Sequence, residues 1–215
     1  MADTTSEKSR RGSYAKSKNT RASILDAALA VFAEAGYHKG SIREVAKRVG
    51  MSEPGLLHHF PSKSGLLEAV LTLRDDKSYA FVPLDKDDGV ASINGLIDLA
   101  AYNASIPGVV ELFCVLSAEA TSTEHPAHAY FSNRYRWTRE NLQRTFEILE
   151  RTGDLRPGVD PARAALSTIA VMDGLQVQWL LDRSSLDMAA ELQAFLSTLT
   201  PLPLGTARIK RPDAP

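Results

Sequence analysis

Residues 41–67 read SIREVAKRVGMSEPGLLHHFPSKSGLL, and their pattern specifies two short helices around a tight turn. The first helix starts after Ser41, which forms a capping box with Glu44: the serine hydroxyl accepts from the backbone of the glutamate, whose carboxylate reaches back. Gly50 then permits a sharp change of chain direction. The stretch therefore begins with a short capped helix that ends in a turn.

The second helix of this stretch is bounded by serine and proline. Ser52 can cap it, and Pro54 falls in its first turn, where a missing N–H costs nothing. Pro61 stops the helix at His59 or Phe60, because a proline disfavours helical backbone in the residue before it. Two short helices joined by a four-residue turn have the spacing of a helix-turn-helix, whose second helix enters the major groove of DNA.

The residues of this second helix divide into a buried and an exposed face. At ~100° per residue, Leu56 and Phe60 form the buried stripe and His58 points the opposite way. A metal held by the adjacent His58 and His59 is disfavoured, because chelation from one helix needs a spacing of three or four residues. We expect His58 near the centre of the face that a major groove receives.

Charge favours a nucleic-acid partner at this end of the chain. Residues 1–64 hold 11 Lys/Arg against 6 Asp/Glu, whereas residues 65–215 hold 14 against 20. A basic segment on an acidic body is typical of a protein that meets a polyanion. Helix N-termini and basic side chains are the usual phosphate contacts. The predicted DNA-binding residues are Ser41, Arg43, Lys47, Ser52, Glu53, Pro54, Gly55, Leu57, His58, His59 and Lys63.

Helical periodicity continues through the rest of the chain, and no alternating pattern is long enough for a sheet. A flexible basic arm is expected over residues 1–19, then a helix from Arg21 to Ala35, with Gly36 in the left-handed conformation after it. The sequence therefore predicts an all-α fold. Later helices are expected near 64–79, 89–105, 108–121, 126–152, 161–182 and 186–199.

The segment from about residue 20 to residue 70 resembles the TetR family of one-component transcriptional repressors. The resemblance rests on Phe32, Gly36 and Tyr37, on the capped SIREVAKRVGMS, and on LLHHFPSK leading into LL. It implies an all-α subunit of nine or so helices, with a three-helix DNA-binding head and a helical body. It also implies a homodimer, joined through the last two long helices, that binds a palindromic operator of double-stranded DNA and is released by a small-molecule effector.

The resemblance also implies domains and roles. Ser41 and Lys63 correspond to phosphate contacts, and the family commonly has a tyrosine where this chain has Leu57. Leucine has no hydroxyl to donate to a phosphate, although it can touch a thymine methyl group. The positions that read bases correspond to Glu53, Pro54, Gly55 and His58. The expected domains are a flexible basic arm (1–19), a helix-turn-helix domain (20–64), a ligand-binding and dimerisation domain (65–200) and a C-terminal tail (201–215).

The body contains aromatic and polar residues suited to an effector site, although the same residues would also suit a core or a dimer interface. Met172, Gln176 and Trp179 share one face of the penultimate helix, where Gln176 is a candidate to orient a ligand. Small apolar residues in 162–174 and 188–199 favour close helix packing in a dimer. The predicted ligand-binding residues are Tyr102, Phe113, Tyr130, Trp137, Met172, Gln176 and Trp179.

The sequence gives little indication of a catalytic site or a metal site. The chain contains no G-x-S-x-G elbow, P-loop or G-x-G-x-x-G motif. Cys114 is the only cysteine and lies in an apolar run, where cysteine is typical core filler. His125 and His128 have a chelating spacing, but surface histidines are more often solvated. We expect no enzyme activity, no metal and no cofactor.

The cellular compartment of the protein and the signal that controls it can also be considered from the sequence. A single cysteine favours a reducing cytoplasm, and no apolar run reaches the ~18 residues of a membrane span. Two alternatives to effector-controlled repression stay open. One is a DNA-binding regulator controlled by a protein partner, and the other is a helical small-molecule-binding protein or enzyme whose basic head is incidental.

Overall fold

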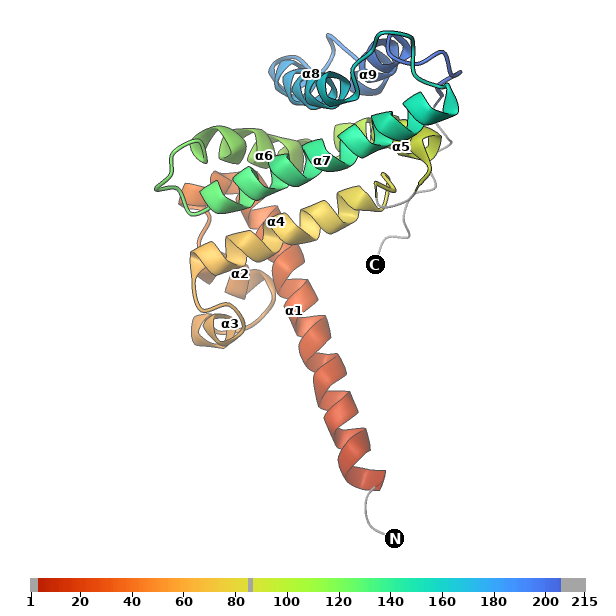
Figure 1. The fold of residues 1–215 in the computed structure, drawn as a ribbon. Helices are drawn as coiled ribbons and strands as arrows, with labels where there is room; N and C mark the ends of the chain where they lie inside the picture. The colour runs from red at the N-terminus through yellow and green to blue at the C-terminus, as the bar shows by residue number, and fades with distance from the viewer. Residues whose placement is uncertain (1–3, 85–86, 206–215) are drawn as a thin grey trace. The chain divides into compact units, whose positions relative to one another are not determined.

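The computed structural model describes residues 4–84 and 87–205, with side chains from residue 19 onward. Over these ranges it contains nine α-helices and no strand, which confirms the predicted all-α class (Figure 1). Contacts divide the chain into two compact units, residues 1–73 and residues 74–215.

The first unit consists of α1 (Thr4–Lys39), α2 (Ile42–Arg48), α3 (Glu53–His59) and the first part of α4 (Lys63–Tyr79). Its core is apolar and draws on every one of these helices, since Phe32, Val45, Leu56 and Leu66 each have almost no exposed surface. Burial of these side chains fixes α2 and α3 around their turn.

Helix α1 is longer than the sequence predicted. The expected start at Arg21 is wrong, because the helix begins at Thr4 and includes most of the segment expected to form a flexible arm. Residues 4–20 contain no proline, and a nucleated helix extends at little cost per residue. At the other end, Gly36 interrupts the helix with a φ of 73° and a ψ of 164°, so its φ is positive as expected, but its ψ is extended.

Serine side chains cap the next three helices, as predicted for the first two. The hydroxyl oxygen of Ser41 accepts from the backbone N–H of Glu44 at 3.1 Å, and that of Ser52 accepts from Gly55 at 3.2 Å. Ser62 accepts from Gly65 at 3.0 Å at the start of α4. These bonds satisfy N–H groups that a helix start leaves unpaired, so local sequence fixes where each helix begins.

The second unit contains the end of α4 and five further helices, close to the predicted ranges. Helix α7 ends at Gly153, whose φ of 80° and ψ of 13° are left-handed. Helix α8 packs against α6, α7 and α9, and α5 packs against α7 and α9. The described part of the C-terminal tail is tied down, because Gln193 donates to the carbonyl of Leu204. The helices are α5 (Gly89–Ala104), α6 (Pro107–Glu119), α7 (His128–Thr152), α8 (Pro161–Leu181) and α9 (Met188–Ser197).

By length and composition alone, α8 could cross a membrane. The core helix of a soluble protein passes the same test, and α8 packs against three other helices. A capping aspartate, Asp160, starts it by accepting from the backbone of Arg163. Packing within the second unit buries part of the apolar surface of α8, including Ala165 and Ile169, and leaves Leu166, Val177 and Leu181 exposed.

Candidate functional site

Helix α3 presents the exposed face that the sequence predicted. Leu56 and Phe60 are buried in the first unit, whereas Glu53, Pro54 and His58 are exposed. The ring of His59 is half-buried and meets the ring of His58 edge-on, with centroids 5.8 Å apart. The exposed face is therefore small and polar, with one imidazole standing on it.

Arg21 stabilises the end of α3 from α1. Its Nη1 donates to the carbonyl of His59 at 3.0 Å, and its guanidinium carbon lies 4.1 Å from the centre of the Phe60 ring. A cation at a helix C-terminus interacts favourably with the helix dipole. This arginine therefore positions the end of α3, a role that the sequence did not reveal.

Lys63 also contacts the protein itself. Its Nζ donates to the carbonyl of His38 at 3.1 Å and lies 4.5 Å from the centre of the Tyr37 ring. Burial lowers the pKa of the Lys63 ammonium. An ammonium has three donors, so a phosphate contact remains open to it alongside this bond.

Two further basic residues on α2 are more exposed than Lys63. Arg43 and Lys47 point to solvent, whereas Arg48 forms a two-armed ion pair with Glu34 of α1 at 2.9 Å and 2.5 Å. The arginine-glutamate pair ties α2 to α1. Arg43 and Lys47 are therefore the better-placed cations for a polyanion.

Two cavities in the second unit meet at a group of polar side chains. The larger, which we call the α6 cavity, has a volume of about 180 Å³ and is walled by Phe113, Phe131 and Tyr135. The other, the α5 cavity, has a volume of about 60 Å³ and lies against Leu96 and Leu99. Both cavities are lined by Arg74, Arg134, Asp173 and Gln176.

A charged cluster from α4 and α7 lies at these cavities. Asp75 accepts from Arg134 Nε at 2.8 Å and from the Tyr130 hydroxyl at 2.5 Å. Arg74 stacks on the Phe113 ring, with its guanidinium carbon 4.0 Å from the ring centre, and its Nη1 lies 3.5 Å from Asp75 Oδ1. The Asp75 carboxylate therefore forms hydrogen bonds with Tyr130 and Arg134, whereas its distance to Arg74 is too long for a good hydrogen bond.

Burial changes the proton affinities in this cluster. Burial and the neighbouring charge of Arg134 lower the pKa of Arg74 to about 10. Burial and the Asp75 charge raise the pKa of Tyr130, and burial raises that of Asp173, which accepts from the Tyr135 hydroxyl at 2.8 Å. The pKa of Arg74 lies well above neutrality, so its guanidinium stays charged at neutral pH.

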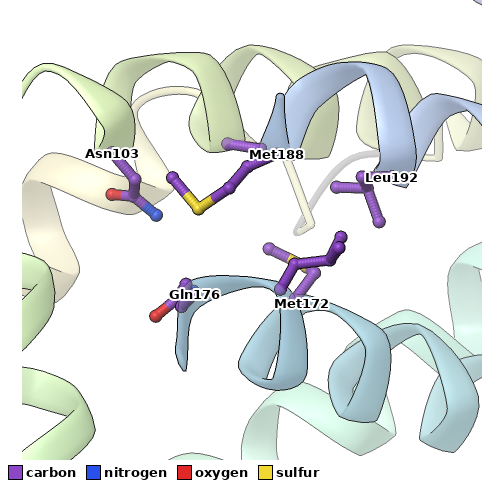
Figure 2. A pocket seen from close by; sticks show the side chains of 7 residues that line it. Asn103, Met172, Gln176, Met188 and Leu192 are labelled. Atoms are coloured by element: carbon purple, nitrogen blue, oxygen red, sulfur yellow. The ribbon is translucent and has the colours of Figure 1, made fainter. Parts of the chain in front are cut away.

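A third, small cavity of about 10 Å³ lies beside α9 (Figure 2). Asn103, Met188 and Leu192 line one side, and Met172 and Gln176 of α8 face them. Gln176 lines all three cavities, and its amide oxygen lies 3.8 Å from the Cys114 thiol that donates to it. The position of Gln176 fits a ligand-orienting role.

The structure distributes the predicted ligand residues unevenly. Phe113, Met172 and Gln176 line the cavities, whereas Tyr130 acts on Asp75. Tyr102 stacks on Phe81, with ring centres 4.7 Å apart. The two tryptophans also lie outside the linings of these cavities: Trp137 packs on Tyr79 with centroids 4.6 Å apart, and Trp179 is buried beneath Arg183.

Sequence reasoning missed the charged members of the site. Arg74 follows Leu67 and Leu71 along the buried stripe of α4, and Arg134 follows Phe131 by three residues on α7. A charged residue on an apolar helix stripe is the signal that could have revealed both arginines.

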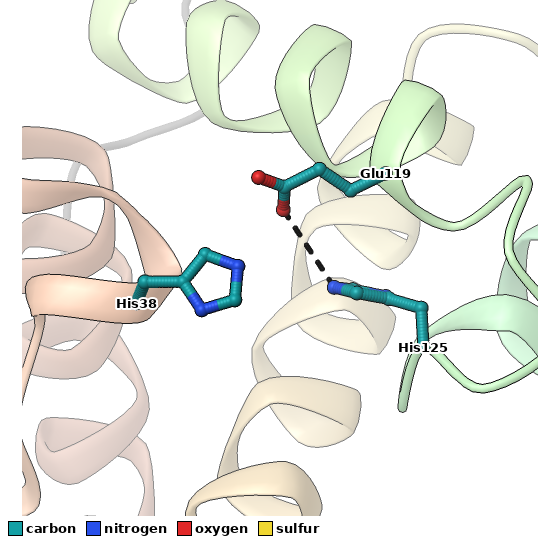
Figure 3. Close-up of side chains that lie close together, drawn as sticks. All are labelled: His38, Glu119 and His125. Carbon is teal, nitrogen blue, oxygen red and sulfur yellow. Dashed lines mark ion pairs between the residues drawn. The ribbon is translucent and has the colours of Figure 1, made fainter.

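The histidine pair before and within α7 makes contacts inside the second unit. Nε2 of His125 lies 3.6 Å from Oε2 of Glu119 (Figure 3), and Nδ1 of His128 lies 2.8 Å from the carbonyl oxygen of Ala120. Although His125 and His128 are three residues apart in sequence, their rings therefore contact different groups, Glu119 and the Ala120 carbonyl.

Comparison with known proteins assigns both units. Residues 24–70 match the family described as bacterial regulatory proteins, tetR family, and residues 107–201 match the C-terminal part of the BetI-type transcriptional repressors. The chain belongs to the TetR family. It is therefore a DNA-binding transcriptional regulator, as the capped helix pair predicted. Regulators of this family typically are repressors with small-molecule effectors and form homodimers.

Individual relatives of this TetR-family chain are distant over its full length. The regulator UidR of Escherichia coli is 23% identical over 173 residues, which cover 80% of this chain and 85% of UidR. The transcriptional activator FasR of Mycolicibacterium smegmatis is 44% identical over 62 residues, which cover 29% of this chain and 28% of FasR. A TetR-family regulator from Rhodococcus shares the fold, with a TM-score of 0.72, 21% identity and coverage of 85% and 99%.

Proposed function

We propose that this regulator is a homodimeric repressor that leaves its operator when a small molecule occupies the α5 and α6 cavities. The observation that carries the proposal is the group Arg74, Arg134, Asp173 and Gln176, which lines both cavities beside apolar and aromatic walls. Ligand sites combine apolar walls with a few convergent polar groups in this way.

The DNA contacts follow from the exposed faces of α2 and α3. His58 stands on the face of α3 that a major groove would receive, so it is assigned to base or backbone contact at the centre of the groove. The hydroxyls of Ser41 and Ser52 accept capping bonds and keep their protons for phosphate oxygens. Arg43 and Lys47 supply sequence-independent attraction.

Helix α8 supplies the surface for a second copy. It exposes Leu166, Val177 and Leu181, with 55%, 48% and 84% of their surfaces accessible in the single chain. An exposed apolar face on a long helix is stabilised by burial against a symmetric mate. We assign dimerisation to α8 and α9, with two recognition helices spaced about 34–36 Å apart on the operator, or by a multiple of one DNA turn.

Helix α4 is the element through which an effector would act. Its residues 63–73 belong to the first unit and residues 74–79 to the second, so one continuous helix carries both Lys63 and Arg74. An effector shifts DNA binding only by preferring one arrangement of the dimer over another. A ligand that contacts Arg74 would bias that choice through α4.

The experiment begins with selection of bound duplexes from a random pool, which identifies the operator and its half-site spacing. His58→Ala is then expected to reduce discrimination between the selected and mutated duplexes by about 1–3 kcal/mol. Lys47→Ala is expected to weaken all duplexes alike and to lower the salt slope by about 1. Lys47 suits this test better than Lys63, whose bond to His38 makes it part of the fold of the first unit.

Arg139→Ala, on the exposed face of α7, is the matched control and is expected to leave duplex affinity unchanged. Unchanged affinity in both His58→Ala and Lys47→Ala at low salt would contradict the assignment of the DNA face. Half-sites without a regular spacing would contradict the dimer.

A further inference from the structure

Arg74 is a buried cation with an unfilled hydrogen-bonding position. Only 6% of its surface is exposed, and its Nη1 is fully buried without a hydrogen-bond partner. The nearest carboxylate oxygen, Asp75 Oδ1, lies at 3.5 Å and receives a shorter bond from Arg134. Buried donors are almost always paired, because an unpaired one loses its hydration without compensation.

The other side chains of the cluster leave this position open. The second oxygen of Asp75 accepts from Tyr130, and Asp173 accepts from Tyr135. The Phe113 ring stacks on the guanidinium and holds it in place without accepting a conventional hydrogen bond. Arg74 is therefore fixed in orientation while one of its N–H groups lacks an acceptor.

The space beside Arg74 is of a definite size and character. The α6 cavity measures about 180 Å³, and Phe113, Phe131 and Tyr135 form its walls. An apolar protein cavity of about 150 Å³ accommodates one benzene molecule. The cavity therefore has room for a single aromatic ring with a small substituent.

We propose that the α6 cavity binds a small aromatic carboxylate, with its ring against Phe113, Phe131 and Tyr135 and its carboxylate accepting from Arg74 Nη1. A carboxylate matches the planar guanidinium and supplies the acceptor that the cluster lacks. Gln176, whose carbonyl oxygen accepts from Cys114, keeps its amide N–H groups for the same carboxylate. The inference rests on the proposed effector site and names its ligand class.

The charge state supports this assignment. The pKa of Arg74, about 10, leaves the guanidinium protonated at neutral pH, so it can attract an anion. A ring without an acceptor group would fill the cavity but leave the buried donor unpaired. Asp173, the carboxylate that lines the same cavity, accepts from the Tyr135 hydroxyl, so the open N–H of Arg74 is the group that an anion would reach. The anionic group is therefore the feature that the site selects.

The test uses benzoate and its neutral analogue benzamide as probes of the native chain. Calorimetric titration at millimolar concentrations is expected to show benzoate binding at least about 10-fold tighter than benzamide, because the benzamide oxygen can accept from Arg74 but carries no charge to pair with the guanidinium. Equal affinity for both probes, or no benzoate binding, would overturn the proposal. This comparison needs no variant, so it is decisive even if substitutions at Arg74 prevent folding.

Arg74→Met keeps an unbranched, largely apolar side chain and removes the guanidinium, and it is expected to weaken benzoate binding about 10- to 100-fold. Arg136→Met removes an exposed arginine from α7 and is expected to leave benzoate affinity unchanged. Undiminished benzoate binding in folded Arg74→Met would also overturn the proposal.

Duplex release separates this inference from the proposed function. If benzoate binds in an Arg74-dependent manner without releasing the operator, the anion site stands and effector control is wrong. If benzamide releases the operator as well as benzoate does, effector control stands and the assignment of an anionic ligand is wrong. Release by benzoate alone, lost in Arg74→Met and kept in Arg136→Met, would support both.

Discussion

The two units of this regulator differ in what they bury. Over the described side chains of the first unit, residues 19–73, the buried side chains are apolar, and the charged groups lie toward solvent. The second unit buries Arg74, Asp75, Asn103 and Asn141 together with several hydroxyl side chains. The first unit therefore carries its chemistry on the surface, whereas the second carries it inside.

This difference follows from what each unit meets. A duplex presents phosphates and base edges to an outer surface, so an apolar core suffices to hold two short helices in place. A small molecule must be enclosed, and enclosure requires polar groups inside the body. Buried charges cost desolvation energy, so they persist where they are paired or where a ligand completes them.

The largest expected effect is in the interior of the body. Asp75→Ala removes the carboxylate shared by Arg134, Tyr130 and Arg74 and leaves both guanidiniums without the oxygen atoms that pair with them. We expect the free energy of unfolding to fall by about 3–5 kcal/mol, measured by urea denaturation of the full chain. The exposed neighbour provides a control, since Asp76→Ala should change it by less than about 0.5 kcal/mol.

A loss of stability no larger in Asp75→Ala than in Asp76→Ala would remove the contrast between the two units. It would mean that water or a rearranged side chain compensates the two arginines. The polar interior would then be a consequence of the packing, and the case for an enclosed ligand site would weaken.

The sequence predicted the head well because its signals are local. Ser41, Ser52, Pro54 and Pro61 act on backbone within a few residues of themselves, so the helix boundaries of α2 and α3 follow from neighbouring letters. The start of α1 was predicted wrongly, because no local signal marks a boundary in residues 4–20. Long-range partners of the head, such as that of Arg21, could not be read from the sequence.

The residues that line the α5 and α6 cavities were harder to predict because they come from five helices far apart in sequence. Of the predicted ligand-binding residues, Phe113, Met172 and Gln176 line these cavities, whereas the two tryptophans do not. The two arginines can be predicted from the sequence only by asking which charged residues fall on the apolar face of a helix. The pairing of Arg134 with Asp75 depends on how α4 and α7 pack, which no periodicity specifies.

A smaller effect is expected where the head depends on one polar contact. Arg21→Ala removes the donor to the His59 carbonyl and the stacking on Phe60, so the end of α3 should open more readily. A loss of about 1 kcal/mol corresponds to roughly 5-fold faster amide exchange at that end of α3. Arg43→Ala, at an exposed position of α2, should leave that exchange unchanged.

Equal exchange in Arg21→Ala and the native chain would show that the apolar core alone holds α3. In that event no polar contact would be needed to hold the recognition helix in the first unit. Faster exchange accompanied by a uniform loss of duplex affinity would show that Arg21 acts by positioning the recognition helix.

The smallest effect concerns Cys114, which lines the α6 cavity beside Gln176. Burial and the nearby Asp173 charge raise the pKa of its thiol from 9.0 to about 11. Because the folded pKa lies above the unfolded one, the contribution of this thiol to stability is complete below pH 9 and is lost as the pH rises through 11. Alkylation by iodoacetamide at pH 8 should therefore be slow in the folded chain and fast in urea. Equal alkylation rates in the folded and unfolded chain would mean that Cys114 is open to solvent. The contrast between a polar interior in the second unit and a polar surface in the first would then not hold at this residue.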